Sequence, residues 1–241
     1  MWSDMALTLA LAVSSTAWTV VAPPATQAQW SCANASPEQW RVQRDARGEL
    51  VFARAPAQTP QIVFAMPDGG QLVGTDHGEF GGSVEWVSDA GDQRLRLLDA
   101  NPVAFTAWRG DIYIASGLSH LGLEHGEVYR MRQQGRGRWQ IDKVLDLGEA
   151  PSAAAAEGDA WTLATGTGLV RVDLRTLALT RVHTNPQWWQ VHPISIARRE
   201  GRWFVGARSA VIRLSPLGEG WREDWMVPTA CAAVRGCGCR S

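Results

Sequence analysis

A short pattern of histidine and carboxylate residues occurs twice in this chain and is the clearest candidate for chemistry. Residues 76–79 read Asp-His-Gly-Glu, and residues 124–127 read Glu-His-Gly-Glu. An imidazole and a carboxylate together can ligate Zn²⁺ or another divalent ion, and they can act as base and acid in hydrolysis. A divalent metal ion is therefore the one cofactor that the sequence suggests. The candidate metal ligands are Asp76, His77, Glu79, His120 and His125.

The same pattern also has a structural explanation, because duplication of a glycine turn flanked by solvated polar residues would produce the same repeated sequence. No motif such as His-Glu-x-x-His fixes the geometry of a metal. A Gly-x-Ser-x-Gly nucleophile elbow is also absent from the sequence. The residues therefore leave open whether the protein is an enzyme.

A pair of adjacent tryptophans, Trp188 and Trp189, is the best candidate for ligand binding. They lie in the polar segment 185–190. Adjacent side chains point in different directions, so at least one is expected to be exposed, where it would suit a sugar, peptide or protein partner. The alternative is that both pack in the interior. The predicted ligand-binding residues are Trp188, Trp189, His183, His192 and Glu124.

The elements that must position these residues belong to a repeat. Glycine turns recur at 69, 110, 158 and 201, each after a short apolar segment. Four strand-like segments fill each period of roughly 40–45 residues, which is the period of a propeller blade. Complete units span 60–99, 102–147, 151–184 and 191–227. The tryptophans within these strands are expected to pack between units: Trp86, Trp139, Trp161, Trp203 and Trp221.

The two ends of the chain predict a fifth unit. Residues 230–236 begin another repeat, and segments 29–34, 39–44 and 49–54 offer the missing strands. A ring needs such closure, because a single blade cannot bury its faces alone. We therefore expect an all-β, five-bladed β-propeller of four-stranded blades, closed by strands shared between the N- and C-termini.

The segment Gly168–Val182 resembles the third and fourth strands of a quinoprotein- or YVTN-type propeller repeat. This resemblance implies the propeller fold. The Gly-His and Trp-Asp pairs of WD40 repeats and the regular Gly-Gly pairs of kelch repeats are absent. No propeller subfamily is therefore assigned.

Residues 1–28 have the pattern of a signal peptide. An apolar core is followed by Pro23-Pro24, and small residues precede a cleavage site between Ala28 and Gln29. Residues 29–241 would then form a single propeller domain, located in the periplasm or secreted. An N-terminal anchor helix is the alternative.

The four cysteines fit an exported protein, in which an even count indicates disulfides. They are Cys32, Cys231, Cys237 and Cys239. We expect Cys32 to pair with one of the C-terminal cysteines and to hold the ring closed, although the sequence alone does not choose among the pairings. Metal ligation by the C-terminal cysteines is the competing interpretation.

Composition and topology limit the classes of function that the protein can have. A formal net charge of −1 argues against a nucleic-acid partner, and no span long enough to cross a membrane follows the signal sequence. In four-stranded antiparallel units, the connections that carry all five histidines share one face. We expect an exported, non-catalytic binding or scaffold propeller whose histidine-bearing face takes a protein, peptide or glycan. The alternatives are a metal-dependent hydrolase or lactonase-like propeller and a glycan-binding or glycan-active propeller.

Overall fold

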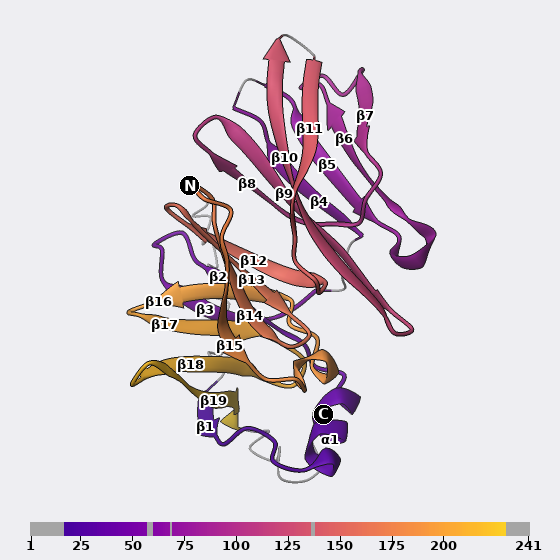
Figure 1. The fold of residues 1–241 in the computed structure, drawn as a ribbon. Helices are drawn as coiled ribbons and strands as arrows, with labels where there is room; N and C mark the ends of the chain where they lie inside the picture. Colours follow the sequence, from indigo (N-terminus) through magenta and orange to yellow (C-terminus); the bar gives the residue numbers. More distant parts are fainter. Residues whose placement is uncertain (1–16, 57–59, 68, 136–137, 230–241) are drawn as a thin grey trace, which may run out of the picture.

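The computed structural model describes residues 17–56, 60–67, 69–135 and 138–229, which form an all-β fold of five sheets. Four of these sheets each contain four strands that follow one another in chain order and pair antiparallel, and one of the four also gains a fifth strand from the N-terminal part of the chain. Figure 1 shows the four sheets succeeding one another along the molecule in the order of the chain. This arrangement confirms the four predicted repeat units.

We refer to these four units as blades 1 to 4. Blade 1 contains β4 (Gln61–Ala65), β5 (Gln71–Asp76), β6 (Gly82–Val87) and β7 (Arg94–Leu98). Blade 2 contains β8 (Pro102–Trp108), β9 (Asp111–His120), β10 (Leu123–Gly135) and β11 (Arg138–Asp146). Blade 3 contains β12 (Pro151–Glu157), β13 (Ala160–Thr165), β14 (Gly168–Asp173) and β15 (Leu179–Thr184). Blade 4 contains β16 (Ser195–Arg199), β17 (Arg202–Gly206), β18 (Val211–Leu217) and β19 (Gly220–Pro228).

Glycine turns set the register of the first hairpin in blades 2 and 4. Trp108 pairs with Asp111 across a two-residue loop, in which Arg109 and Gly110 both have positive φ. The loop between β16 and β17 has the same form at Glu200 and Gly201. Positive φ at both central residues is the requirement of the type I′ turn, whose twist matches that of paired strands. The recurring glycines of the sequence are thus turn residues.

The hydrophobic core lies between the blades. Ile112 and Ile114 of β9 pack against blade 1, whereas Tyr113 and Ala115 of the same strand pack against blade 3. This alternation follows from the two-residue period of a strand, which sends neighbouring side chains to opposite faces of a sheet. Each inner blade therefore buries both faces of its sheet. Its strands carry more apolar residues than the strands of a sheet with one solvent-exposed face.

The predicted interblade role of the strand tryptophans holds for Trp161 and Trp203, which are buried. Trp161 belongs to the core between blades 2 and 3, and Trp203 belongs to the core between blades 3 and 4. Trp86, Trp139 and Trp221 pack against interblade cores but stay partly exposed.

The N-terminal part of the chain packs on blade 4. Strand β1 (Trp18–Val21) pairs with β19 as a fifth strand of that sheet. Strands β2 (Trp40–Arg44) and β3 (Leu50–Arg54) form a separate two-stranded sheet. Trp40 and Val42 of β2 are buried against Val211 of blade 4. The predicted strands at 39–44 and 49–54 are therefore present, as a hairpin stacked on blade 4.

The prediction of a strand at 29–34 was wrong, because these residues lie in helix α1 (Gln27–Ala35). Thr26 caps the helix: its hydroxyl accepts from the backbone N–H of Gln29, and the Gln29 side chain accepts from the backbone N–H of Thr26. This reciprocal pair is a capping box, which favours a helix start. Trp30 and Ala33, three residues apart on one helix face, are buried in the core beside Trp225.

None of the described sheets is closed on itself. Residues 230–236 and the three C-terminal cysteines lie outside the described residues, so the shared blade and the Cys32 disulfide remain predictions. Residues 17–28 of the predicted signal peptide carry β1 and the cap of α1. Within the described part of the chain, no helix is long and apolar enough to cross a membrane.

Candidate functional site

The predicted ligand-binding and metal-binding residues lie at one end of the strands, in the connections or in the strand residues near them. In every blade, the connection between the second and third strands and the connection to the next blade lie at the same strand ends, because consecutive strands are antiparallel. We call the surface formed by these connections the loop face. Its loops touch one another: the Asn101 side-chain amide donates to the carbonyl oxygen of Gly78 at 2.8 Å, and the Trp189 backbone N–H donates to that of Gly166 at 2.7 Å.

Two of the predicted metal ligands meet on this face. His120, the last residue of β9, places its Nε2 atom 2.6 Å from a carboxylate oxygen of Glu79, which lies in the 3-10 helix η1 (Gly78–Phe80) of blade 1. Both side chains are about half exposed. The pair therefore joins two neighbouring blades at a site that solvent and a ligand can reach.

The other predicted metal ligands have different surroundings. Asp76 accepts a hydrogen bond from the backbone N–H of Gly78 at 2.7 Å, which stabilises the start of η1. His77 is exposed in the same turn, and His125 lies in β10 opposite Leu118. Among the described residues, no group of three or more His, Cys, Asp or Glu side chains could hold a metal ion. The predicted metal site thus has no geometric support in this part of the chain.

The two adjacent tryptophans have opposite environments. They begin the 3-10 helix η2 (Trp188–Gln190) between blades 3 and 4, in which Trp188 is fully buried and Trp189 is 55% exposed. Trp189 lies beside Gly166, where an added Cβ atom would be 3.2 Å from the Trp189 Cβ and 3.8 Å from a carboxylate oxygen of Glu124. The structure therefore brings Trp189 and Glu124, both predicted ligand residues, to the same turn.

Trp188 and His183 instead belong to an interior cluster around Glu223 of β19. One oxygen of the Glu223 carboxylate lies 2.8 Å from Nε2 of His183. The carboxylate also accepts hydrogen bonds from the indole N–H of Trp225 at 2.8 Å and from that of Trp188 at 3.4 Å. The side-chain amide of Asn185 donates a further hydrogen bond at 3.1 Å. Its side chain is only 8% exposed. Burial opposes ionisation of this carboxyl, but the hydrogen bonds from His183, Trp225 and Asn185 hold its pKa below the ordinary value. The cluster ties blade 3 to blade 4 in the interior of the protein.

His192 follows η2 and has a positive φ of 46°. Burial lowers the pKa of its imidazole, and the nearby positive charge of Arg208 lowers that pKa further. The lowered pKa favours the neutral form of the ring. A neutral imidazole can donate and accept hydrogen bonds at the margin of the loop face.

Sequence reasoning missed three exposed apolar residues on the loop face. Phe80 in η1 is 88% exposed, and Leu121 and Leu123 at the β9–β10 hairpin are 90% and 68% exposed. They come from blades 1 and 2, and Trp189 adds a fourth exposed apolar side chain from the connection after blade 3. The signal was present in the sequence, because all three residues lie next to turn glycines in otherwise polar segments.

Comparisons with known proteins assign no family to this chain. No known family model and no curated protein matches the chain. Among solved structures, the CNH domain of AfRom2 aligns over 86% of this chain and 74% of its own at 10% identity, with a TM-score of 0.46. A gluconolactonase from Xanthomonas campestris aligns over 82% of this chain and 78% of its own chain at 13% identity, with a TM-score of 0.46. Virginiamycin B lyase from Staphylococcus aureus aligns over 86% of this chain and 87% of its own chain at 11% identity, with a TM-score of 0.37.

The repeated four-stranded antiparallel sheets make this chain a propeller-like repeat protein. No subfamily follows from the blade sequences or from these matches.

Proposed function

We propose that this protein is an exported, non-catalytic binding propeller whose loop face takes a polypeptide partner. The observation that carries the proposal is the exposure of Phe80, Leu121, Leu123 and Trp189 in connections on that one face. Exposed apolar and aromatic side chains gain free energy when a partner removes them from water. A polypeptide offers the apolar side chains that would cover them.

The shape and charge of the site support this class of partner. Leu121 and Leu123 flank Gly122 at the tip of the β9–β10 hairpin, so they project from the surface and suit insertion into a groove of the partner. Glu79 and Glu124 are exposed beside the apolar residues. We therefore expect a partner segment with apolar side chains and nearby basic residues, whose charges would meet these carboxylates at the rim.

The test selects peptides from a displayed library on the wild-type protein and then compares their affinities for variants. Leu121→Asp and Trp189→Ala should each weaken binding roughly tenfold or more, as expected for central contact residues. Leu217→Asp is the matched control, because this leucine is also exposed but lies at the other end of the strands, as the last residue of β18. Peptides that bind Leu121→Asp and Trp189→Ala as well as the wild type would contradict the proposal.

Export is part of the same proposal and has its own measurement. Mass spectrometry of the protein recovered from the periplasm or medium should give a chain that begins at Gln29. A recovered chain that still contains Trp18 would contradict the cleavage site and would keep β1 in the mature fold.

A further inference from the structure

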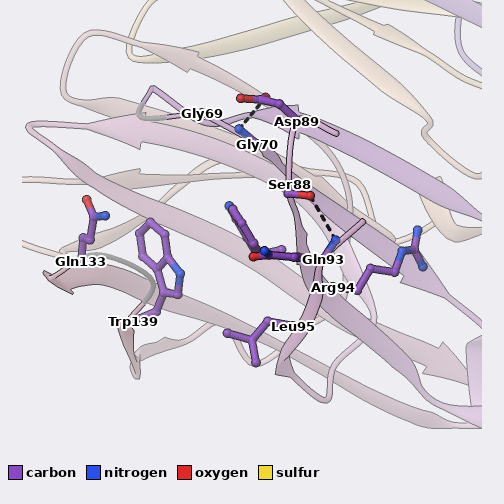
Figure 2. Close-up of a pocket in the computed structure, with 10 residues that line it drawn as sticks. Gly69, Gly70, Ser88, Asp89, Gln93, Arg94, Leu95, Gln133 and Trp139 are labelled. Atoms are coloured by element: carbon purple, nitrogen blue, oxygen red, sulfur yellow. Dashed lines mark hydrogen bonds between the residues drawn. The ribbon is translucent and has the colours of Figure 1, made fainter. Parts of the chain in front are cut away.

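A pocket lies at the strand ends opposite the loop face, between blades 1 and 2. It has a volume of about 480 Å³, which is within the usual range for small-molecule sites. Figure 2 shows Gln133 and Trp139 of blade 2 on one side and Gln93, Arg94 and Leu95 of blade 1 on the other. The remaining lining residues are Gly69, Gly70, Trp86, Ser88 and Asp89.

Two tryptophans from different blades give the pocket its apolar surfaces. Trp86 of β6 pairs across the strands with Leu95, and Trp139 of β11 pairs with Gln133. Both indoles pack on the core between blades 1 and 2 and remain partly exposed. Neither indole N–H has a hydrogen-bond partner within the described ranges of the chain. Each therefore offers a ring surface and a donor to a ligand.

The turn between β4 and β5 holds the pocket open. Gly70 has φ +76°, and a Cβ atom there would be 2.7 Å from the Trp86 Nε1 atom and 2.6 Å from the carbonyl oxygen of Val87. Only glycine leaves room for the indole at this distance. The backbone N–H of Gly70 also donates to one carboxylate oxygen of Asp89 at 2.7 Å. That bond fixes Asp89 at the pocket and leaves its second oxygen as an acceptor.

The charge of the lining selects the ligand class. Asp89 and Arg94 are the charged residues of the lining, so it is formally neutral, and Arg94 is also paired with Glu85 at 3.1 Å. A phosphate would need unpaired cationic groups. A purely apolar ligand would cover the second oxygen of the Asp89 carboxylate without offering it a donor, which costs free energy. Indole surfaces together with carboxylate, amide and guanidinium groups instead match a molecule with apolar C–H faces and a rim of hydroxyl groups.

We propose that this pocket binds a neutral carbohydrate through one or two pyranose rings. The C–H face of a sugar ring would stack on Trp86 or Trp139. Its hydroxyl groups would donate to Asp89 and would accept from Arg94 and the indole N–H groups. None of these residues lies on the loop face, so the carbohydrate site is independent of the polypeptide site.

The test measures binding of maltose, cellobiose and chitobiose to the full chain by tryptophan fluorescence and by saturation-transfer NMR. At least one disaccharide should bind at millimolar or lower concentration. Trp139→Ala should weaken that binding roughly tenfold or more, because it removes a stacking surface. Trp86→Phe, which keeps a ring but removes the N–H donor, should weaken it by a smaller factor. Trp189→Ala on the loop face should leave the affinity unchanged.

Gln93→Ala is a second test of the pocket that should not unfold the protein. Gln93 is an exposed turn residue, and its truncation leaves the core intact. It should also weaken sugar binding. Absence of binding by all three disaccharides to the wild type would overturn the carbohydrate proposal. Equal affinity of the wild type, Trp139→Ala and Gln93→Ala would overturn the assignment to this pocket. Peptide binding sensitive to Leu121→Asp would persist in both cases, so the two proposals fail separately.

Discussion

Glu223 shows how a single buried carboxylate can hold two blades together. It is contacted by His183 and Asn185 at the end of blade 3 and by the indole N–H groups of Trp188 and Trp225. A buried charge is tolerated when its hydrogen-bonding capacity is filled. At this position the sequence places polar groups inside the protein for stability, although a histidine beside a carboxylate looks like a catalytic pair.

Glu223→Ala should lower the free energy of unfolding by about 3 kcal/mol, because it leaves several buried donors without an acceptor. Urea denaturation at neutral pH measures this change. Glu219→Ala is the matched control, since Glu219 is exposed in the turn between β18 and β19, and it should stay within about 0.5 kcal/mol of the wild type. Equal stability of the two variants would contradict the bridging role of Glu223.

The lowered pKa of Glu223 also predicts a pH dependence. A carboxyl whose pKa is lower in the folded state than in the unfolded state stabilises the protein above the ordinary pKa of 4.5. That stabilisation is lost as the pH falls from 4.5 through the folded-state pKa, because over this range the carboxyl of the unfolded chain takes up a proton more readily than the folded one. The unfolding free energy of the wild type should therefore fall more steeply below pH 4.5 than that of Glu223→Gln. Parallel curves for the two proteins would exclude this linkage.

Tyr129 offers a second titration at the residue scale. Burial raises the pKa of its phenol to about 12, and the hydrogen bond to Glu127 and the charge of that carboxylate act in the same direction. Carbon-13 NMR of labelled tyrosine should show Tyr129 titrating near this value. Glu127→Gln should lower the midpoint, because it removes the neighbouring negative charge. An unchanged midpoint in that variant would assign the shift to burial alone.

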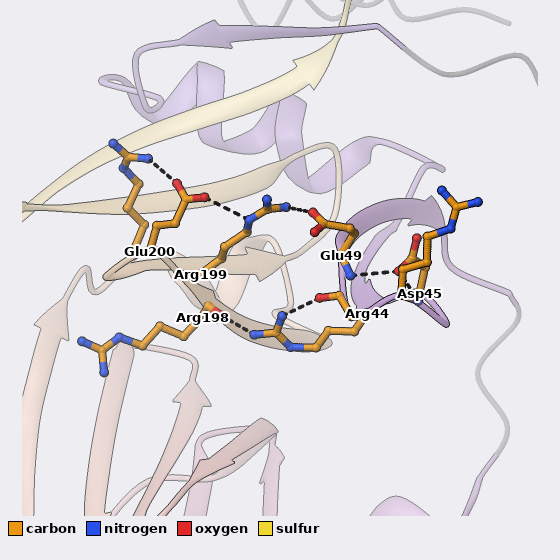
Figure 3. A network of polar contacts seen from close by, with 9 residues as sticks. Arg44, Asp45, Glu49, Arg198, Arg199 and Glu200 are labelled. Atoms are coloured by element: carbon orange, nitrogen blue, oxygen red, sulfur yellow. Dashed lines mark hydrogen bonds and ion pairs between the residues drawn. The ribbon is translucent and has the colours of Figure 1, made fainter.

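At the scale of elements, the β2–β3 hairpin is joined to blade 4 by both polar and apolar contacts. Figure 3 shows Arg199 of β16 between Glu49 and Glu200, and Arg44 of β2 donating to the backbone carbonyl of Arg198. These charged side chains are largely exposed, and such pairs contribute about 0–1 kcal/mol each. The buried contacts of Trp40 and Val42 with Val211 are therefore the larger source of stability.

Strand β1 also depends on apolar contact. Trp18 packs edge-to-face on Trp40 and Phe52, with ring centroids 4.8 and 5.2 Å away. In a chain that retains residues 17–28, Trp18→Ala should lower the unfolding free energy by about 2 kcal/mol, less than for a fully buried aromatic residue. Thermal and urea denaturation measure this change. Val20→Ala is the control, because Val20 lies in the same strand but points to solvent. Equal stability of the two variants would mean that β1 adds nothing to the fold.

At the scale of the whole molecule, the predicted link between Cys32 and the C-terminal cysteines would connect α1 to the far end of the chain. Closure of so long a loop should stabilise the fold by up to about 5 kcal/mol in the chain-entropy model. Mass mapping of the oxidised protein should recover the Cys32 peptide joined to a C-terminal peptide, and reduction should lower the Tm. This prediction would be contradicted by a disulfide between Cys237 and Cys239 together with the absence of any disulfide-linked peptide that contains Cys32.

Local pattern was sufficient for the blades but not for the N-terminal segment. Short segments of alternating or continuous apolar residues between glycine turns gave the strands of all four units. Alternation indicates a strand with one buried face, and a continuous apolar run indicates a strand that buries both. Residues 29–34 formed a helix because the Thr26–Gln29 capping box and the spacing of Trp30 and Ala33 outweighed the expected repeat. The same spacing of two apolar residues fits a helix or an irregular strand when the segment is short.

The candidate site was predicted in part. Trp189 and Glu124 lie at one turn, and His120 meets Glu79 across two blades. Trp188, next to Trp189 in the sequence, is buried in the interior. Nothing local distinguishes these two tryptophans, because the direction of η2 decides which one faces solvent.

The sequence by itself determined the repeat, its strands and its turns, because these depend on a period of two residues and on glycine backbone angles. Only the tertiary structure decided which polar and aromatic residues are accessible. Burial depends on the neighbouring blade, and that neighbour comes from another part of the chain. The same rule separates Glu223 in the interior from Glu124 on the surface, and Trp161 in the core from Trp86 and Trp139 at the pocket.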